Sequence, residues 1–540
     1  MPVQINGNTL KHIIISASNN LYNNRKAVDD LNVFPVPDGD TGTNMSLTIS
    51  AVKKVLLDVD TLNCGEVAKY ASSASLRGAR GNSGVILSQL FKGFYTAIAD
   101  CETINIEDIK RAMESAKDAA YNAVSKPTEG TVLTVARVMA EKAAEYDENN
   151  GDITLFLKYI VKEGNKILAA TTDMLPQLRM ANVVDAGGKG LMVVMEGALY
   201  YLENGSIVPC KENIKAKEKK GTKKQSKEDI KFGYCTEFII NKKETEMNWQ
   251  KLKAKLEKIG DCVVVVDDFD IIKVHVHTNN PGIALEEAIK YGSLINIKID
   301  NMREQAHNET VVNEQPKQEM PKIKNAFITV SAGEGLSQMF TELGCTGIIT
   351  GGQTMNPSTE DFMSEIEKIN AENIFILPNN KKIIMAAQQA VDITDKNVVV
   401  IKTRSIVQGI AAMIAYDEEA SFEENTEAMN SAIEEITSAS VTFAARDCVL
   451  DELEIKENDV MGLIEGKINL IGNSPEKVCK EIVQRLVNDE TSSISIYRGE
   501  DAKEDLADAL LEELEALYPD LDVNIYYGGQ PLYYYYISAE

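Results

Sequence analysis

The stretch NVFPVPDGDTGTNM, residues 32–45, places two aspartates, Asp38 and Asp40, on either side of one glycine. Both carboxylates can face one hard cation from a single turn, and Mg²⁺ takes such oxygen ligands while keeping positions for water and substrate phosphate. Gly42, Thr43 and Asn44 lead into a helical pattern, whose free backbone amides favour a phosphate. The stretch predicts a catalytic Mg²⁺ and phosphate site, although an Asp-Gly turn with an aspartate cap needs the same residue types.

Three further glycine-rich loops precede predicted helices. The candidate nucleotide contacts in these loops are Asn82, Ser83 and Gly84 in RGARGNSGV (77–85), Gly130 and Thr131 in KPTEGTVLT (126–134), and Asp185 and Gly187 in NVVDAGGKGL (182–191). Each loop alone is weak evidence for a nucleotide site, since glycine before a helix commonly belongs to a turn or a cap. Together with the first stretch, however, they precede the second, fourth, sixth and eighth helices. In an up-and-down bundle all four loops share one rim, so we favour a nucleotide site there.

The elements that position these loops are helical. Apolar periodicity recurs eight times in the first 208 residues, near 8–26, 43–57, 63–79, 82–98, 106–125, 130–146, 152–172 and 187–204. We therefore expect a first, all-α domain over residues 1–208. The Lys-rich stretch 209–231 has no apolar period and is predicted to be a linker.

The rest of the chain changes character. Residues 232–306 follow the order βαββαβ, which is typical of a ferredoxin-like α+β domain. A second polar stretch, 307–324, is predicted to be a linker. Residues 325–540 alternate strands with amphipathic helices, which predicts an α/β domain with a parallel sheet. In that domain GGQTMNPST (351–359) follows a strand and is interpreted as a turn, and the tyrosine-rich end is interpreted as a core or edge strand.

Composition narrows the functional classes. The net charge of −26 argues against a general nucleic-acid or anionic-membrane binder. No run approaches the roughly 20 apolar residues of a membrane span, so we expect a cytoplasmic protein without stable membrane insertion. A polyphosphate ligand would have to be held by metal ions or backbone amides.

The middle domain carries a second set of candidate metal ligands. In KVHVH, the alternation of a strand places His275 and His277 on one face and two valines on the other. Cys235, on the neighbouring strand, can approach them, and a Cys, His, His set would suit Zn²⁺. A pair of exposed histidines with a buried thiol explains the same residues, and both interpretations stay open. The open sheet face also needs cover, which suggests a homodimer.

The sequence lacks GxxxxGK[ST] and GxGxxG, which excludes a P-loop and a Rossmann dinucleotide motif as the nucleotide site. Its four loop segments together resemble the nucleotide-binding (DhaL-like) domain of dihydroxyacetone kinases, an eight-helix barrel. Through VHVHTNNPG, NMREQ, GGQTMNPST and the tyrosine-rich end, the whole chain is similar to the ATP-binding subunits of bacterial fatty acid kinases. The resemblance implies ATP and two Mg²⁺ held by three acidic side chains. Asp38 and Asp40 match two of these, and the third position carries Asn32.

The resemblance also implies an activity and a partner. The family phosphorylates a fatty acid presented by a separate acyl-binding protein, giving acyl phosphate and ADP. The α/β domain resembles DegV-like and dihydroxyacetone-binding folds, and we expect it to dock the carrier. A fatty acid carboxylate is ionised at pH 7, so no general base is required.

Two alternatives remain. A dihydroxyacetone kinase-type phosphotransferase needs a substrate histidine, and residues 325–540 contain none, so a separate substrate-binding protein would have to supply it. A non-catalytic nucleotide-sensing scaffold would tolerate loss of a metal aspartate. Because Asp38 and Asp40 are both present, we favour an enzyme.

Overall fold

The computed structural model describes residues 3–32, 39–124, 126–147, 151–210, 232, 234–243, 249–268, 271–301, 322–352, 356–450 and 453–540. The chain divides into two compact units. One unit joins Met1–Lys215 to Pro321–Glu540, and the other is Ala216–Met320. The first unit is therefore discontinuous in sequence and holds both a helical region and an α/β region.

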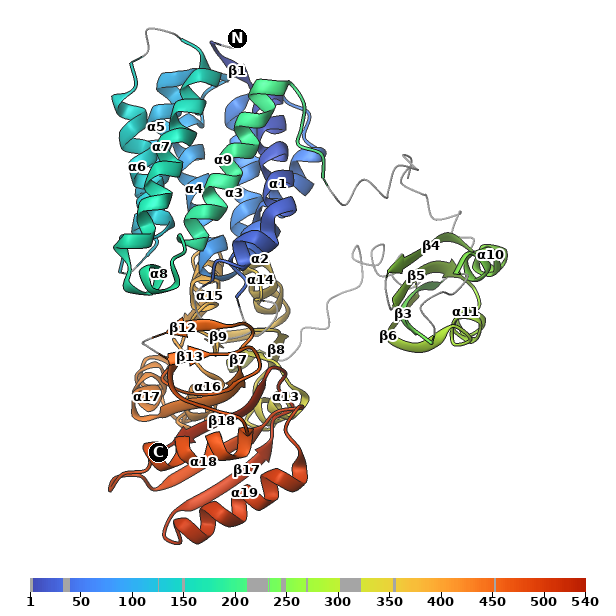
Figure 1. Cartoon of the computed structure of the whole chain (residues 1–540), viewed down its shortest axis with the longest axis vertical. Coiled ribbons are helices and arrows are strands. Elements are labelled where there is room, and N and C mark those ends of the chain that lie inside the picture. Colours follow the sequence, from blue (N-terminus) through green and yellow to red (C-terminus); the bar gives the residue numbers. More distant parts are fainter. Residues whose placement is uncertain are drawn as a thin grey trace. The chain divides into compact units, whose positions relative to one another are not determined.

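The helical region consists of long helices that run side by side (Figure 1). They are α1 (Gly7–Asp29), α2 (Thr41–Leu57), α3 (Cys64–Arg77), α4 (Gly81–Ile98), α5 (Ile106–Asn122), α6 (Val132–Glu145), α7 (Ile153–Met174) and α9 (Ala186–Asn204), with a short α8 (Pro176–Ala181) between the last two. The eight long helices match the eight predicted segments. The sequence analysis missed α8 and a two-residue pairing of β1 (Ile5–Asn6) with β2 (Thr103–Ile104), because neither is long enough to show periodicity.

Apolar faces of these helices form the core. Fully buried side chains include Leu21, Ile49 and Phe156, which lie on three different helices. An apolar cavity of about 210 Å³ remains between the helices, bordered among others by Leu10 and Phe91. Across the described residues, no helix combines the length and apolar character that a bilayer crossing requires.

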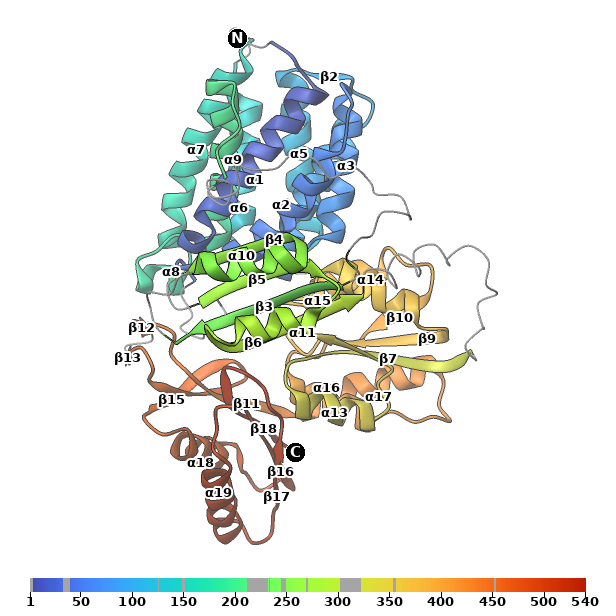
Figure 2. The same ribbon diagram turned by 90° about the vertical axis from the view of Figure 1, so that its right-hand side faces the viewer.

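In its described residues, the unit Ala216–Met320 is a four-stranded sheet with two helices on one face (Figures 1 and 2). Its elements are β3 (Tyr234–Lys242), α10 (Trp249–Ile259), β4 (Gly260–Asp268), β5 (Ile271–Thr278), α11 (Pro281–Ala288) and β6 (Gly292–Asn301). The strand order is β4-β5-β3-β6, and the paired strands are antiparallel. Val274 and Val276 are fully buried in the cluster that also contains residues of α10 and α11, as the predicted alternation requires.

The α/β region begins with a parallel sheet, which confirms the predicted architecture. Its elements are β7 (Ile323–Ser331), α13 (Glu334–Glu342), β8 (Gly347–Thr350), α14 (Thr359–Lys368), β9 (Ala371–Leu377), α15 (Ile384–Val391), β10 (Asn397–Val400), α16 (Ile406–Ile414) and α17 (Phe422–Glu435). The strand order is β10-β9-β7-β8, and every pairing is parallel. Strand β7 starts inside the stretch 307–324 that we predicted to be a linker.

A six-stranded sheet of order β15-β14-β11-β18-β16-β17 follows. The elements of this part are β11 (Thr437–Phe443), β12 (Cys448–Leu450), β13 (Leu453–Ile455), β14 (Val460–Ile464), β15 (Lys467–Gly472), α18 (Pro475–Leu486), β16 (Ser493–Arg498), α19 (Glu504–Leu517), β17 (Asp522–Tyr527) and β18 (Tyr533–Ala539). The tyrosine-rich end thus forms two strands, β17 at the sheet edge and β18 inside the sheet. Tyr535 of β18 is fully buried, whereas Tyr527 of β17 is half exposed.

Candidate nucleotide site

One polar pocket of about 320 Å³ receives side chains from all four glycine-rich loops. The predicted site residues that line it are Asn32, Asp40, Asn44, Asn82, Ser83, Thr131, Asp185 and Gly187. The loops precede α2, α4, α6 and α9, so the shared rim inferred from the helix order is present. The lining also includes Thr41, Ile86, Val124, Lys126, Thr128, Val132, Leu133 and Lys382, which the sequence analysis did not single out as ligand contacts.

Asp40 stands at the N-cap position of α2. Its carbonyl oxygen accepts the backbone N–H of Asn44 at 2.8 Å, while its side chain makes no capping hydrogen bond. The carboxylate is instead contacted by two residues of the α/β region. Asn356 Nδ2 donates to Asp40 Oδ2 at 2.5 Å, and Lys382 Nζ lies 3.6 Å from Asp40 Oδ1. The carboxylate therefore points into the pocket and does not close the helix end.

Asn32 lines the same pocket as Asp40. Its Oδ1 accepts from the Thr41 hydroxyl at 2.8 Å, and its amide donates to the Asp29 carbonyl oxygen at 2.8 Å. An amide oxygen and a carboxylate that line one pocket are hard oxygen donors of the kind that Mg²⁺ takes. These residues therefore fit the expected cation. Asp38, the second predicted carboxylate, lies outside the described residues.

Thr43 and Gly42 are used for helix packing. The backbone N–H and the hydroxyl of Thr43 both donate to the Asp29 carboxylate, at 3.0 and 2.7 Å, which ties the start of α2 to the end of α1. A Cβ on Gly42 would lie 2.2 Å from the Arg25 carbonyl oxygen. Neither residue is part of the pocket lining, so the phosphate contact predicted for them stays a prediction.

The second loop opens α4. Gly81 adopts φ +57°, a left-handed conformation that favours glycine, and this turn directs the exposed Asn82 and the half-buried Ser83 to the pocket. Gly84 does not line the pocket. A Cβ there would lie 2.4 Å from Thr48 Oγ1, so this glycine allows α4 to pack closely on α2.

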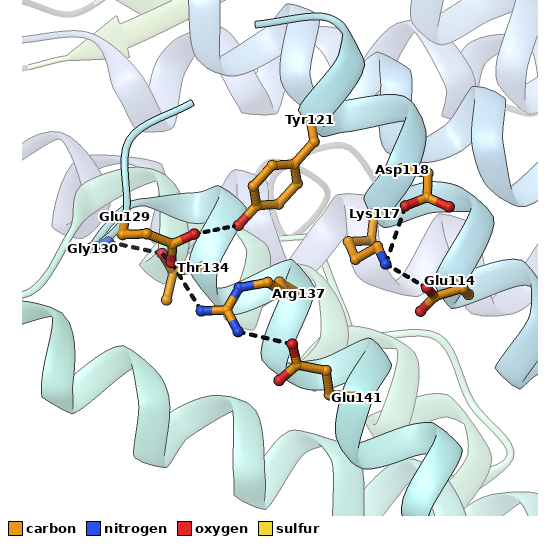
Figure 3. A network of polar contacts seen from close by, with 9 residues as sticks. All are labelled: Glu114, Lys117, Asp118, Tyr121, Glu129, Gly130, Thr134, Arg137 and Glu141. Atoms are coloured by element: carbon orange, nitrogen blue, oxygen red, sulfur yellow. Dashed lines mark hydrogen bonds and ion pairs between the residues drawn. The ribbon is translucent and has the colours of Figure 1, made fainter. Parts of the chain in front are cut away.

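A carboxylate holds the third loop in place (Figure 3). Glu129 accepts hydrogen bonds from the hydroxyls of Tyr121 and Thr134 at 2.9 and 2.6 Å and from Arg137 at 2.9 Å. The hydrogen bond from Thr134, followed by that from Arg137, lowers the pKa of Glu129. Gly130, at φ +86°, donates its N–H to Thr134 Oγ1 at 2.8 Å and does not line the pocket. This network fixes the loop that presents Thr131.

Asp185 lies in the fourth loop and caps the helix that follows it. It is the N-cap of α9, and its carboxylate accepts the Gly188 N–H at 2.6 Å. Burial raises the pKa of Asp185 to about 6, against the lowering effect of the backbone N–H groups of Gly188, Val132 and Gly187. Because Val132 opens α6, this carboxylate joins the starts of two helices at the pocket.

Sequence reasoning missed Asn356 and Lys382. Asn356 lies in GGQTMNPST, which we interpreted as a turn, and it stands two residues before Ser358, the N-cap of α14. Lys382 precedes α15. The capping box of Ser358 and Asp361 marks a helix start, and the resemblance carried by GGQTMNPST assigned no role to Asn356, so neither signal indicated a second half of the site.

The candidate Zn²⁺ ligands are only partly described. The side chains of Cys235 and His275 lie outside the described residues, and His277 is half-buried. The strand register pairs Cys235 with His277, as the predicted neighbouring strands require. Among the side chains that the structure describes, no group of three or more His, Cys, Asp and Glu residues could hold a metal ion. The Zn²⁺ site and the homodimer therefore stay predictions.

Three family models match this chain. They are a DAK2 domain over residues 35–200, the middle domain of the FakA-like fatty acid kinase family over 231–309, and the C-terminal domain of the same family over 326–540. An uncharacterized protein of Staphylococcus haemolyticus is 41% identical over 99% of this chain and 100% of its own length. The chain belongs to the FakA-like fatty acid kinase family.

Solved structures resemble this FakA-like chain over smaller parts. The Streptococcus pneumoniae fatty acid kinase B3 protein, loaded with linoleic acid, is 15% identical over 40% of this chain and 99% of its own, with a TM-score of 0.29. The C. freundii dihydroxyacetone kinase, in complex with AMP-PNP and Mg²⁺, is 13% identical over 41% of this chain and 49% of its own, with a TM-score of 0.30.

Proposed function

We propose that this chain is an ATP-dependent kinase that transfers the γ-phosphate of ATP to the carboxylate of a fatty acid, giving acyl phosphate and ADP. A DegV-like, fatty-acid-binding carrier protein presents the acyl chain. The observation that carries the proposal is one polar pocket to which all four glycine-rich loops contribute, with Asp40 of the first loop among the lining residues. Its volume of about 320 Å³ falls at the lower end of the range for ligand pockets.

The proposed site residues divide into two groups by chemistry. Asn32, Asp38 and Asp40 supply the oxygen ligands for two Mg²⁺ ions, which when bound neutralise charge on the transferring phosphoryl group. Asn44, Asn82, Ser83, Thr131, Asp185 and Gly187 line the rest of the pocket and contact the nucleotide. We also propose that the long helices close into an eight-helix barrel and that the unit Ala216–Met320 has a ferredoxin-like fold, with Cys235, His275 and His277 as Zn²⁺ ligands.

The fatty acid acceptor does not require the protein to supply a general base. A fatty acid carboxylate has a pKa close to that of a glutamate, about 4.3, so it is already a nucleophile at neutral pH. Phosphoryl transfer then needs positioning and charge neutralisation rather than proton abstraction. The described pocket residues supply amides, hydroxyls, carboxylates and lysines, which suit that task.

The test combines the chain with Mg-ATP and a fatty acid loaded on a DegV-like carrier, and traps acyl phosphate with hydroxylamine. We expect hydroxamate only with the loaded carrier. Asp40→Asn should lower the yield at least about 100-fold, because it removes the anionic ligand for Mg²⁺, whose positive charge would stabilise the transition state. Asp58→Asn, at the exposed opposite end of α2, should leave the yield unchanged.

Two results would contradict the proposal. Triose phosphate formed from dihydroxyacetone, without hydroxamate, would identify a dihydroxyacetone kinase-type phosphotransferase. Tight ATP binding with no turnover on either acceptor would identify a nucleotide-sensing scaffold.

A further inference from the structure

The helical and α/β regions of the first unit meet at the turn between α3 and α4. Arg80 of this turn forms an antiparallel β-bridge with Ser358, and the Thr359 N–H donates to the Ala79 carbonyl oxygen at 3.2 Å. Ala79 and Phe362 are fully buried in one apolar cluster. A packed contact, rather than a chance approach of two surfaces, therefore joins the α/β region to the second glycine-rich loop.

This contact fixes Asn356 beside the metal-binding end of the pocket. Asn356 is 1% exposed, and its carbonyl oxygen accepts from Arg80 Nη1 at 2.7 Å. Arg80 is in turn 3.4 Å from the Asp361 carboxylate. Held in this way, the Asn356 amide donates to Asp40 Oδ2 at 2.5 Å. Each carboxylate oxygen has two lone-pair positions, so this hydrogen bond leaves Asp40 able to bind a cation.

Lys382 brings positive charge to the same end. Its Nζ is 3.6 Å from Asp40 Oδ1, and its side chain lines the pocket. The described lining carries two carboxylates, Asp40 and Asp185, and two lysines, Lys126 and Lys382. A nucleoside triphosphate adds several negative charges to such a site. A lysine ammonium is a compact charge that commonly binds phosphate oxygens.

We propose that the nucleotide site is composite, completed by the α/β region of the same chain. Asn356 is a positioning residue that orients the metal-binding carboxylate of Asp40, and Lys382 binds the polyphosphate of Mg-ATP. This inference rests on the proposed ATP site, and it adds one positioning residue and one ligand-binding residue from a region to which the sequence analysis gave only a docking role.

Lysine 382 is tested by nucleotide titration of the full-length chain. Lys382→Gln should weaken Mg-ATP binding about tenfold, as expected for loss of a charged hydrogen bond, and should leave AMP binding unchanged. Lys381→Gln is the matched control, because it removes the same charge from an exposed neighbouring position. Unchanged Mg-ATP binding by Lys382→Gln would overturn the assignment. Tighter binding would also overturn it, because it would show that this lysine competes with the cation for Asp40.

Asparagine 356 is tested by the affinity for Mn²⁺ in the presence of ATP, measured by electron paramagnetic resonance. Asn356→Ala should weaken Mn²⁺ binding about tenfold, the usual effect of removing a hydrogen bond to a metal ligand. Asn524→Ala, on the edge strand β17, is the control. Mn²⁺ affinity equal to that of the wild type would overturn the positioning role.

The same titrations separate this inference from the proposed function. A wild-type chain that binds neither Mg-ATP nor Mn²⁺ would overturn both. A wild-type chain that binds Mg-ATP, with variants that match it, would overturn the composite site alone.

Discussion

Two carboxylates of the pocket have opposite environments. Asp40 faces an amide and an ammonium group from the α/β region, while Asp185 is enclosed and accepts backbone N–H groups. The first environment leaves the Asp40 carboxylate at the pocket, where a cation can reach it. In the second environment, the Asp185 carboxylate caps α9 and joins its start to that of α6. Residue type alone would not distinguish the two roles, because both aspartates precede a helix.

Asp185 makes the stability of the helical region depend on pH. Its pKa rises from 3.8 to about 6 on folding, so the folded state holds the proton more tightly, and stability falls as pH rises through this window. Asp185→Asn removes the effect, which amounts to at most about 3 kcal/mol. Measured by urea unfolding, the variant should gain stability relative to the wild type between about pH 4 and pH 7. A difference that does not vary with pH would contradict this explanation.

At the residue scale, the sequence predicted those pocket residues that lie in one loop or at the starts of alternate helices of one bundle. Asn32, Asp40 and Asn44 belong to one loop and one helical turn, and all three line the pocket. Asn356 could not be predicted, since it meets Asp40 across a separation of 316 residues. Only the packing of the two regions brings these side chains together, and no local spacing encodes it.

At the scale of elements, the glycines of the loops have two different uses. Gly81 and Gly130 adopt positive φ, so they shape the turns. Gly42 and Gly84 instead permit close helix contacts. The sequence pattern does not separate these uses, because both place glycine at the start of a helix. The eight long helices were predictable because their apolar periodicity is local in sequence. The strand order of the six-stranded sheet was not predictable, because it is set by distant pairings such as β11 with β18.

Gly84→Ala tests the close contact of α4 with α2. The added methyl group would meet Thr48 Oγ1 at 2.4 Å, and Thr48 is fully buried and donates to the Asn44 carbonyl oxygen at 2.8 Å. Overpacking of this kind should lower the free energy of unfolding by about 1–3 kcal/mol, seen as a lower midpoint in calorimetry. The control Gly282→Ala meets nothing within 4 Å and should leave its midpoint unchanged or slightly raised. A midpoint for Gly84→Ala equal to that of the wild type would refute the packing role of Gly84.

At the scale of the whole molecule, the first unit is assembled from two segments that the chain separates by the unit Ala216–Met320. Besides the apolar cluster around Ala79 and Phe362, polar contacts join the two segments. Gln389 donates to the Ser88 hydroxyl at 3.4 Å, and the Arg446 guanidinium donates to the Asp30 carbonyl oxygen at 2.6 Å. The contact thus involves helix α15 beside the parallel sheet and the loop that follows β11.

A disulfide tests this arrangement directly. Arg80 and Ser358 face each other in an antiparallel bridge, in which Cα atoms are about 4.5–5.5 Å apart, within the range that a disulfide spans. The double variant Arg80→Cys/Ser358→Cys should form a crosslink under mild oxidation, identified by peptide mass spectrometry. The pair Arg80→Cys/Glu342→Cys, with its second cysteine on α13, is the control. A linked control, or an unlinked test pair, would show that the two segments do not meet in this way.

The separation of Asp40 from Asn356 has a consequence for biosynthesis. At about 5–20 residues per second, the ribosome needs roughly 15–60 s to travel the 316 residues between them. By the end of that interval the four loops of the helical region have long been made, whereas Asn356 has only just been added. With the composite site proposed above, a nascent chain therefore carries an unfinished pocket, and we expect full nucleotide affinity only late in synthesis.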